Sequence, residues 1–461
     1  MATNKEPQQT ADLIVQRLAD TFREHGKQLF LVGGAVRDRL LGRESYDLDM
    51  ATDAVPGEVK RLALAAKPSS IYTVGEKFGT VGLVFDGRAV EITTFRSEEY
   101  VPRSRKPMVT FGTSLRGDLS RRDFTINAIA YDVINGQLID PFGGLRDLKA
   151  GVIRAVGDPF QRFDEDPLRL LRAVRFAAQL NFTIERRTAE AITACKDRLR
   201  TVSQERIADE MNKILLSPHP ALGIKLMVRL SLAEVVLPEL MPMVGLDQGD
   251  RQHKDVLEHT LGVLENTPPN LELRWTALLH DIGKPATKTV RDGKIHFYGH
   301  EIVGADMARD ILTRLKMDNR TINKVTKLVR MHMRCNLYEP DWTDGAVRRL
   351  IREAGDEFDE LLALSRADIT SHRPQRIEAA LSRVDEIEER AKYLIEQENV
   401  RQLASPLDGH ELMAIFGRPP GPWIREVKEF LLAKVLDGEL APDDKARAEE
   451  LAREFLRHET G

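Results

Sequence analysis

Residues 1–155 alternate short apolar runs with glycine and aspartate, a pattern typical of strands separated by turns. Stretches of helical periodicity lie between these runs, so we expect a mixed α/β region at the start of the chain. The runs that predict strands are QLFLV (28–32), TVGLVF (80–85), RAVEITTF (88–95) and IAYDVI (129–134).

After about Pro159 the pattern changes to long helical periodicity, with apolar residues three and four positions apart. A polar break at 245–252 precedes a second helical block, which carries several histidines and runs to about residue 375. The chain ends in an amphipathic, charge-rich helix at 443–456. We therefore expect an α+β protein with a mixed-sheet head followed by a long all-α body. The first helical stretches of the body are predicted at 166–180, 188–199 and 204–216, and residues 221–240 continue this helical body.

The composition excludes several classes of protein. The 461 residues are 42% hydrophobic and 30% charged, which suits a globular protein of roughly two to four domains. A net charge of −4 means that any RNA-binding surface is local. Two cysteines, Cys195 and Cys335, are too few for a disulfide framework and indicate a reducing compartment. The polar N-terminus and the lack of a long apolar run predict a soluble, cytoplasmic protein with no membrane partner.

The stretch LFLVGGAVRDRLLG (29–42) predicts a strand, a turn at Gly33 and Gly34, and a short helix. Glycine lets the backbone turn sharply and approach a ligand closely. The free N–H groups at the start of a helix suit a phosphate, and Arg37 on the first helical turn is placed to bind an anion. A glycine pair alone is weak evidence for phosphate binding, because most such pairs serve only the turn.

The segment YDLDMAT (46–52) adds two carboxylates after this turn. Asp47 and Asp49 are two residues apart, so on a strand they share one face while Leu48 and Met50 face the core. Two carboxylates on one face repel unless a cation lies between them, and Mg²⁺ prefers oxygen ligands. An isolated pair is usually a solvated strand end, but after the glycine turn it favours nucleotidyl transfer.

Four motifs in this order resemble those of one enzyme family. The chain is similar to class II tRNA nucleotidyltransferases and bacterial poly(A) polymerases, which belong to the polymerase-β superfamily. The helical remainder resembles that of members with a C-terminal HD domain. The motifs are GGAVRDRLLG (33–42) with DLD (47–49), SRRDFTINAIAYD (120–132), LIDPFGGLRDLKAGVIRAVGDP (138–159) and FDEDPLRLLRAVRFAA (163–178).

The resemblance implies a role for each matching position. Asp47 and Asp49 would be catalytic and bind Mg²⁺, and Glu91 could supply a third carboxylate. Taken alone, Glu91 reads as a solvated residue of a half-exposed strand, and Arg122 could equally form a salt bridge to a neighbouring carboxylate. The residues implied to bind the nucleotide are Gly34, Arg37, Arg122, Asp166, Arg169, Arg172 and Arg175.

The segment DEDPLRLLRAVRF (164–176) offers a way to choose nucleotides without a template. Asp166 and Pro167 predict the N-cap and first position of a helix, on which three arginines recur every third residue and share one side. Cytosine and adenine both present an amino donor beside a ring-nitrogen acceptor, which a carboxylate with a guanidinium complements. The resemblance assigns this role to Asp166 and Arg169, with the next two arginines in support. The alternative is a capped helix with a solvated charged face.

Residues 100–122 hold six Lys or Arg and a single acidic residue, Asp118. We expect a mobile basic loop here, which either binds RNA phosphates or is an ordinary solvated loop. In the family, a flexible loop in this region is linked to addition of the final A, and enzymes that add only CC lack it. The length of the segment therefore favours a complete CCA activity.

The second helical block carries a set of metal-binding residue types. Their order resembles that of HD-domain phosphohydrolases, and imidazole with carboxylate suits Mn, Fe, Ni, Zn or Mg, so the identity of the divalent metal stays open. His300 and His332 could line the same pocket or bind a second ion. For each histidine alone a core or surface role is the alternative, and the domain could also serve mainly to hold tRNA. The residues in HD order are His259, His280, Asp281 and Asp368.

We therefore predict a template-independent nucleotidyltransferase that builds or repairs the 3′-terminal CCA of tRNA from CTP and ATP. The alternatives are a poly(A) polymerase, an enzyme that adds only the A or CC part, and an HD phosphohydrolase whose head merely binds nucleotide. The sequence predicts no oligomeric state. The predicted segments are an N-terminal helix (1–27), a nucleotidyltransferase head (28–158), a helical neck for RNA binding and nucleotide selection (159–243), an HD-type domain (244–400) and a helical tail (401–461).

Overall fold

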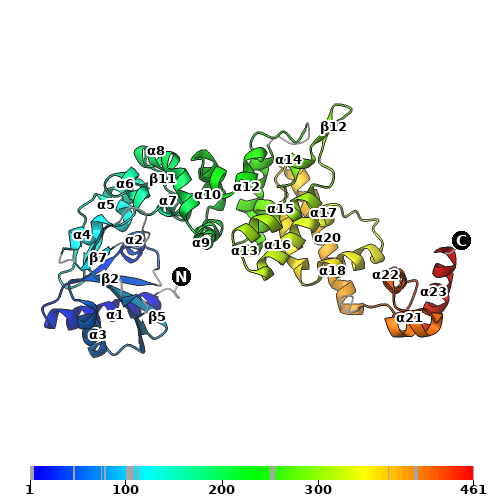
Figure 1. Ribbon diagram of the computed structural model, residues 1–461, viewed down its shortest axis with the longest axis horizontal. Helices are drawn as coiled ribbons and strands as arrows, with labels where there is room; N and C mark the ends of the chain where they lie inside the picture. Colours follow the sequence, from blue (N-terminus) through cyan, green and yellow to red (C-terminus); the bar gives the residue numbers. More distant parts are fainter. Residues whose placement is uncertain are drawn as a thin grey trace. The chain divides into compact units, whose positions relative to one another are not determined.

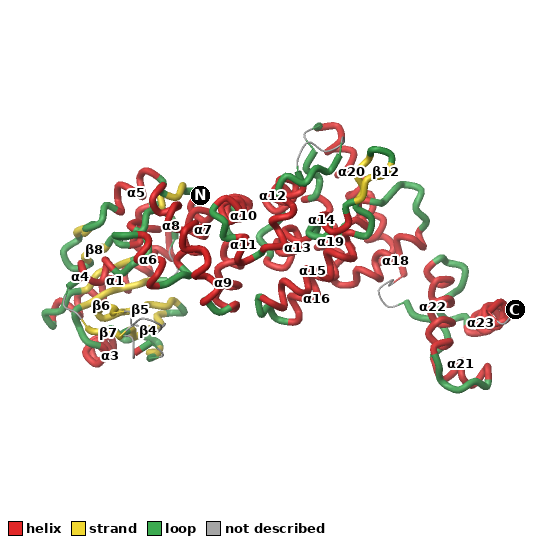
Figure 2. Tube along the Cα trace, turned by 45° about the horizontal axis from the view of Figure 1, so that its top comes forward, coloured by secondary structure: helices red, strands yellow, loops and turns green. Residues whose placement is uncertain are grey.

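The structure is a computed structural model that divides into two compact units, Met1–Pro238 and Glu239–Gly461. Strands belong mainly to the first unit, whereas the described part of the second is helical apart from one short hairpin (Figure 2). The predicted α+β class, with a mixed-sheet head followed by a helical body, is confirmed. The structure describes residues 5–44, 47–73, 75–76, 79–99, 108–111, 114–249, 255–371, 373–398 and 403–459.

A seven-stranded sheet forms the head, in the order β3-β4-β5-β2-β1-β8-β9. The β2 and β5 strands run parallel, and all other neighbours run antiparallel. Each of the four predicted strand runs forms a strand, namely β1, β4, β5 and β8. The bounds are β1 Leu29–Val32, β2 Leu48–Thr52, β3 Ser70–Tyr72, β4 Thr80–Phe85, β5 Arg88–Thr94, β8 Ala130–Asp132 and β9 Gln137–Ile139.

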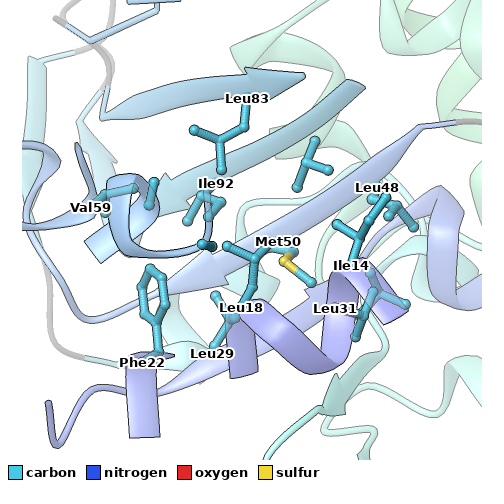
Figure 3. Packing of buried hydrophobic residues seen from close by; sticks show 14 of the residues in the cluster. Ile14, Leu18, Phe22, Leu29, Leu31, Leu48, Met50, Val59, Leu83 and Ile92 are labelled. Atoms are coloured by element: carbon cyan, nitrogen blue, oxygen red, sulfur yellow. The ribbon is translucent and has the colours of Figure 1, made fainter. Parts of the chain in front are cut away.

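Helices α1 (Lys5–Glu24) and α3 (Pro56–Ala65) pack on one face of this sheet. Figure 3 shows Leu18 and Phe22 of α1 against Leu29 of β1 and Met50 of β2. The other face of β1 is covered as well, since Phe30 packs on Phe95 with ring centroids 5.9 Å apart. The strand β1 is therefore buried along its whole length, and its end delivers the glycine turn from a rigid position.

Short helices complete the first unit after the sheet (Figure 1). The predicted helices at 188–199 and 204–216 are confirmed as α8 and α9, with a 3₁₀ turn following α8. The strands β10 (Val152–Ile153) and β11 (Thr183–Ile184) pair in parallel. The helices are α2 Gly34–Leu40, α4 Leu115–Ser120, α5 Gly144–Ala150, α6 Pro159–Glu165, α7 Arg169–Leu180, α8 Arg186–Cys195, α9 Gln204–Leu215, α10 Pro220–Arg229 and α11 Ala233–Val236.

The predicted start of the helix that carries the three arginines is wrong by two residues, because its N-cap is Leu168 rather than Asp166. Asp158 and Pro159 start a separate short helix, α6, which ends at its C-cap Asp166. The chain then turns, and α7 begins at Arg169 with Leu168 as its N-cap. The side chain of Asp166 still accepts a hydrogen bond from the N–H of Leu168 (3.2 Å), so it holds the turn between the helices.

The predicted basic loop at 100–122 is only partly described. Residues 100–107 and 112–113 lie outside the described residues, and β6 (Arg96–Glu99) pairs with β7 (Met108–Phe111). The prediction of a loop is wrong for 115–120, which form α4 because the Ser114 side chain caps the helix by accepting from the N–H of Gly117 (3.3 Å). Asp118 in this helix is buried and binds Arg121 (2.7 Å).

The second unit is a helical body followed by a small helical end with its own core. The predicted amphipathic helix at 443–456 is confirmed as α23. Within the described part of the chain, no helix has the length and apolar character of a membrane span. The elements are α12 Val256–Asn266, α13 Leu271–Leu279, α14 Lys284–Thr287, β12 Thr289–Arg291, β13 Lys294–His296, α15 His300–Arg314, α16 Asn319–Met331, α17 Met333–Asn336, α18 Asp344–Ala354, α19 Phe358–Ala367, α20 Pro374–Glu398, α21 Gly409–Phe416, α22 Pro422–Leu436 and α23 Lys445–Glu459.

Candidate functional site

Three carboxylates come together where β2 and β5 run side by side. Asp49 on β2 is directly opposite Glu91 on β5, so their side chains share one face, and Asp47 lies just before β2. Burial raises the pKa of Asp49, the charge of Arg122 opposes this effect, and Glu91 and Asp47 raise the pKa further. A divalent cation would relieve this repulsion, so the cluster fits a metal with oxygen ligands.

The glycine turn meets one of these carboxylates and an arginine. Gly33 has a φ of 69° and precedes α2. A Cβ on Gly33 would lie 2.7 Å from Nη1 of Arg122 and 3.7 Å from Oδ2 of Asp49. The missing side chain therefore leaves the space that brings the turn, the guanidinium and the carboxylate together. Arg122 also lies 3.5 Å from Asp118 Oδ2, so both of its predicted roles are compatible with its position.

A buried polar network connects the glycine-turn motif with the second and fourth motifs. Arg37, only 8% exposed, donates to both oxygens of Asp38 (2.8 and 2.9 Å) and to Oδ1 of Asn127 (2.8 Å). Asn127 donates to Oδ1 of Asp123 (3.0 Å), and Arg172 donates to Oδ2 of Asp123 through Nε (2.8 Å) and Nη2 (2.5 Å). Burial alone would raise the pKa of Asp123, but Arg172 and the hydrogen bonds lower it to about 2.

Three arginines surround one aromatic ring on α7. The guanidinium carbons of Arg37, Arg172 and Arg175 lie 5.0, 5.4 and 4.5 Å from the centroid of the buried Phe176 ring. Arg175 also binds Glu210 of α9 (3.0 Å). Arg172 and Arg175 are thus held by carboxylates of the chain itself, and Phe176 packs α7 against Arg37.

The two residues predicted to read the base have other partners in this structure. Arg169 donates to Oε2 of Glu165 (3.1 Å) and to the backbone carbonyl of Arg121 (2.8 Å). Oδ2 of Asp166 lies 3.7 Å from Nη2 of Arg206. Arg169 is buried, so these contacts fix its side chain beside the second motif.

The third motif (138–159) braces the second. Asp147 of α5 accepts a hydrogen bond from Thr125 Oγ1 (2.8 Å) and forms an ion pair with Arg154 (3.0 Å). The N–H of Thr125 binds the carbonyl of Arg154 (2.9 Å). These contacts hold the turn that carries Asn127 in the buried network.

Six buried or half-buried side chains converge in the second unit. They form two groups, and within each group one ligand atom of every residue lies within 4.8 Å of the others. All four residues predicted in HD order belong to the cluster, and the structure adds the two histidines for which the sequence left two roles open. The groups are His259, His280 and Asp368, and Asp281, His300 and His332.

Asp281 faces both groups with different oxygens. Its Oδ2 lies 3.2 Å from Nε2 of His280, and its Oδ1 lies 3.5 Å from Nε2 of His300. Lys284 also donates to Oδ2 (2.7 Å). Burial would raise the pKa of Asp281, but His280 and Lys284 hold it well below its usual range. A carboxylate that stays charged between two sets of imidazoles fits a bridge between two metal ions.

The backbone fixes the orientation of the histidine rings. Three of them place Nδ1 within 2.8 Å of a backbone carbonyl, which turns Nε2 toward Asp281 and the other ligands, where a metal would bind. Nδ1 of His259 lies 2.9 Å from Oγ1 of Thr370 instead. The three carbonyl partners are Ala277 for His280, Phe297 for His300 and Val329 for His332.

A close backbone contact brings the two groups together. A Cβ on Gly283 would lie 2.3 Å from the carbonyl oxygen of His300 and 2.7 Å from the backbone nitrogen of Gly304. Only glycine therefore lets the segment after Asp281 lie directly against the start of α15. The contact places His300 beside Asp281.

Three family models match the chain. The Poly A polymerase head domain matches residues 29–154, the probable RNA and SrmB-binding site of polymerase A matches 181–243, and the HD domain matches 256–372. Among curated proteins, the CCA-adding enzyme of Geobacillus sp. (strain WCH70) is 34% identical over 438 residues, which cover 95% of this chain and 94% of the relative.

The chain belongs to the tRNA nucleotidyltransferase family. The A-adding tRNA nucleotidyltransferase of Deinococcus radiodurans is also similar, with 35% identity over 91% of this chain and 94% of the relative. A crystal structure of the Bacillus stearothermophilus CCA-adding enzyme in complex with CTP aligns over 99% of both chains, with 30% identity and a TM-score of 0.71. The predicted nucleotidyltransferase activity and HD domain are confirmed, and both families depend on metals.

Several residues of this tRNA nucleotidyltransferase were missed by sequence reasoning. Asn127 and Phe176 lie within the quoted motifs, but only their contacts show that they join the motifs. Lys284 follows the His-Asp pair by three residues, a spacing that places it over Asp281 on one helical turn and could have been recognised. Thr370 carries no sequence signal of its own.

Proposed function

We propose that this nucleotidyltransferase builds or repairs the 3′-terminal CCA of tRNA from CTP and ATP, with Mg²⁺. The proposal depends on the meeting of Gly33, Asp49 and Arg122 beside Glu91. These residues combine a backbone turn open to a ligand, a cation for phosphates and carboxylates for metal. The CTP complex of the B. stearothermophilus enzyme supports the same use of the head.

In this proposal each side chain has one task during transfer. Asp47, Asp49 and Glu91 would hold Mg²⁺, which supplies charge neutralisation for the phosphates and for the attacking hydroxyl. Arg122 and the turn at Gly34 would bind the triphosphate. The 3′ oxygen of the RNA forms a bond to the α-phosphorus, the bond from that phosphorus to the bridging oxygen breaks, pyrophosphate leaves and the hydroxyl proton passes to solvent.

Some of the remaining predicted nucleotide-binding residues would contact the nucleotide, and others would hold the contacting residues in place. Arg37 is sequestered by Asp38 and Asn127, so we assign it to positioning the turn as well as to attraction of the triphosphate. Arg172 and Arg175 would support the site through their bound carboxylates. Asp166 and Arg169 would read the base edge, which requires Arg169 to leave Glu165 when the nucleotide binds.

Incorporation of labelled nucleotides tests this proposal. The substrates are tRNAs that end at the discriminator base, at C and at CC, each offered CTP, ATP or both. We expect completion of CCA on all three and no addition beyond it. Addition of A only to the tRNA that ends in CC would indicate an A-adding enzyme like the D. radiodurans relative. Long A tails would indicate a poly(A) polymerase.

We also propose that the HD domain is a metal-dependent phosphohydrolase. The supporting observation is the convergence of six ligands in two groups around Asp281. Two bound metals would supply an activated water and neutralise the phosphate. The water oxygen bonds to phosphorus, the ester P–O bond breaks, and the alcohol leaves with a proton. Hydrolysis of bis(p-nitrophenyl) phosphate with Mn²⁺, Ni²⁺, Zn²⁺ or Mg²⁺, lost in His280→Ala, would support it; equal rates in both proteins would contradict it.

The predicted segments remain a proposal for the domain organisation. The three family models, at 29–154, 181–243 and 256–372, fall within the proposed head, neck and HD segments. Because the proposed substrates are tRNA and nucleoside triphosphates, we propose that the enzyme works in the cytoplasm.

A further inference from the structure

A basic hairpin rises directly from the HD metal cluster. The strands β12 and β13 pair antiparallel, with Thr289 opposite His296 and Arg291 opposite Lys294 (Figure 1). The turn at Asp292 and Gly293 has φ values of 50° and 71°, as a tight two-residue hairpin requires. The proposed role of the cluster in hydrolysis does not account for this hairpin.

Both ends of the hairpin segment are attached to metal-ligand residues. At its start, Lys284 donates to Asp281 Oδ2 (2.7 Å) and lies 5.6 Å from the ring centroid of Phe297. At its end, the carbonyl of Phe297 holds Nδ1 of His300 (2.7 Å). The hairpin segment is therefore joined to the metal-ligand residues at both of its ends.

The charge on the hairpin is unbalanced. Segment 284–298 contains four Lys or Arg and one acidic residue, Asp292. Arg291 and Lys294 are exposed and directly opposite each other, an arrangement that costs free energy unless an anion lies nearby. In the described ranges no acidic side chain forms an ion pair with either of them. The hairpin thus presents an anion-binding face beside the cluster.

An aromatic surface continues this basic face. The rings of His296 and Tyr298 stack with centroids 5.0 Å apart and an interplanar angle of 10°. Tyr298 is 68% exposed, so one of the largest apolar groups of the region lies in solvent. Cations that follow a backbone together with exposed aromatic rings are the combination that binds single-stranded nucleic acid.

We propose that the β12–β13 hairpin binds single-stranded RNA and presents a phosphate ester of the strand to the HD cluster. The bases stack on Tyr298 and His296, while Arg291 and Lys294 bind backbone phosphates and Lys284 lies at the cluster end. Three residues of a strand span roughly 10 Å, which matches about three stacked nucleotides at ~3.4 Å each. The presentation of the ester rests on the proposed hydrolase function, but binding by the hairpin does not.

Photocrosslinking tests the binding separately from any hydrolysis. Oligoribonucleotides of one to five nucleotides carrying 4-thiouridine are crosslinked to the full-length protein, and peptides are mapped by mass spectrometry. We expect crosslinks within 284–298, with a yield that rises to about three nucleotides and then levels off. Crosslinks confined to peptides of residues 29–243 would overturn the proposal.

Two variants and two matched controls sharpen the test. Tyr298→Ala and the double variant Arg291→Ala with Lys294→Ala should each lower the affinity at the hairpin by roughly tenfold. Tyr393→Ala removes a tyrosine of similar exposure (62%) from α20, and Arg320→Ala removes an exposed arginine from α16, so both should leave binding unchanged. Equal crosslinking in all four variants would overturn the role of the hairpin.

Inhibition of small-ester hydrolysis connects binding to the cluster. If bis(p-nitrophenyl) phosphate is hydrolysed, a trinucleotide should inhibit the wild type about tenfold more strongly than the Tyr298→Ala protein, with the rate on the small ester unchanged. Equal inhibition of both proteins would overturn the presentation of RNA to the cluster. No hydrolysis by any protein would contradict the proposed hydrolase alone, and crosslinking would still decide the binding.

Discussion

In the head, the carboxylates proposed to bind metal lie on or just before the neighbouring strands β2 and β5, with Asp47 exposed and Asp49 half-buried. In the HD cluster, four histidines and Asp281 are buried, and each histidine ring is held through Nδ1. In the head, the fixed side chains are not these carboxylates but a neighbouring buried hydrogen-bond network. It connects Arg37 to Arg172 through Asn127 and Asp123. The same polypeptide thus offers an open set of oxygen ligands and a closed set of mixed ligands.

The difference indicates how each site acquires its metal. A few exposed carboxylates suit a cation that arrives with a triphosphate and is completed by phosphate oxygens and water. A buried set of imidazoles and carboxylates suits an ion that stays between reactions. We therefore expect metal to exchange with substrate in the head and to be part of the folded structure in the HD domain.

The largest expected effect is at the head. Asp49→Ala should reduce incorporation of CTP and ATP by at least about a thousandfold, or roughly 4 kcal/mol, because it removes a metal ligand during phosphoryl transfer. The protein should remain folded, since the variant also relieves repulsion from Glu91 and Asp47. Incorporation rates and thermal melting measure the two effects. His280→Ala is the control and should retain CCA addition; near-normal incorporation by Asp49→Ala with Mg²⁺ would refute the assignment.

The second largest effect is expected when metal is removed with a chelator, which should lower the stability of the second unit but not that of the head. A tightly bound ion present at about a thousand times its Kd stabilises a fold by roughly 4 kcal/mol, so its removal should destabilise the second unit by a similar amount. All three tryptophans, Trp275, Trp342 and Trp423, lie in the second unit, so their fluorescence reports its unfolding alone. Hydrogen exchange of head peptides provides the comparison. Equal destabilisation of both units, or of neither, would contradict the expected difference.

The buried network of the head should show a smaller, pH-dependent effect. The pKa of Asp123 is lowered from 3.8 to about 2, so its contribution is complete above pH ~4 and is lost as the pH falls through about 2. This shift corresponds to about 2 kcal/mol at neutral pH. Asp123→Asn should lose that amount at pH 7, and its difference from wild type should shrink below pH 4. Hydrogen exchange of β1 and β8 peptides measures it, and a difference independent of pH would argue against the ion pair with Arg172.

Nucleotide selectivity should change least. Asp166→Ala should narrow the preference for CTP over UTP by about tenfold, in line with ~1–3 kcal/mol for a base-edge contact, while the triphosphate contacts remain. Asp166 also holds the turn before α7, so thermal melting is required beside the kinetics. Asp164→Ala, which removes a surface partner of Arg198, is the matched control. An unchanged preference in folded Asp166→Ala would show that the base is read elsewhere.

The sequence predicted the elements whose signals are local. The alternating apolar runs identified β1, β4, β5 and β8, because each buries residues against covered faces of the sheet. The order of the motifs identified the nucleotidyltransferase head and the HD domain. The start of α7 was misplaced because Asp166 followed by Pro167 is also a typical helix N-terminus. In the structure Asp166 is the C-cap of α6 and Leu168 is the N-cap of α7, a choice that depends on how the two helices pack.

The long-range parts of the sites were not predictable in the same way. The register that places Glu91 opposite Asp49 depends on strand pairing, and the pairing of Arg169 with Glu165 depends on the turn between helices. The hairpin at 289–296 was missed although the Asp292-Gly293 pair is a recognised signal for a two-residue hairpin turn. Its surroundings are so strongly helical that the short strands did not stand out.

The close contact at Gly283 means that the cluster can change in two independent ways: through its donor atoms and through the spacing between its two groups of residues. Exchange of a ligand such as His332 would change which ion is preferred, because it alters the chemistry of the donor atoms. A side chain on Gly283 would push the start of α15, and with it His300, away from Asp281, while the set of donor atoms stayed the same. Related chains that differ at this glycine are therefore expected to differ in how closely the two ligand groups approach each other rather than in the identity of the donor atoms.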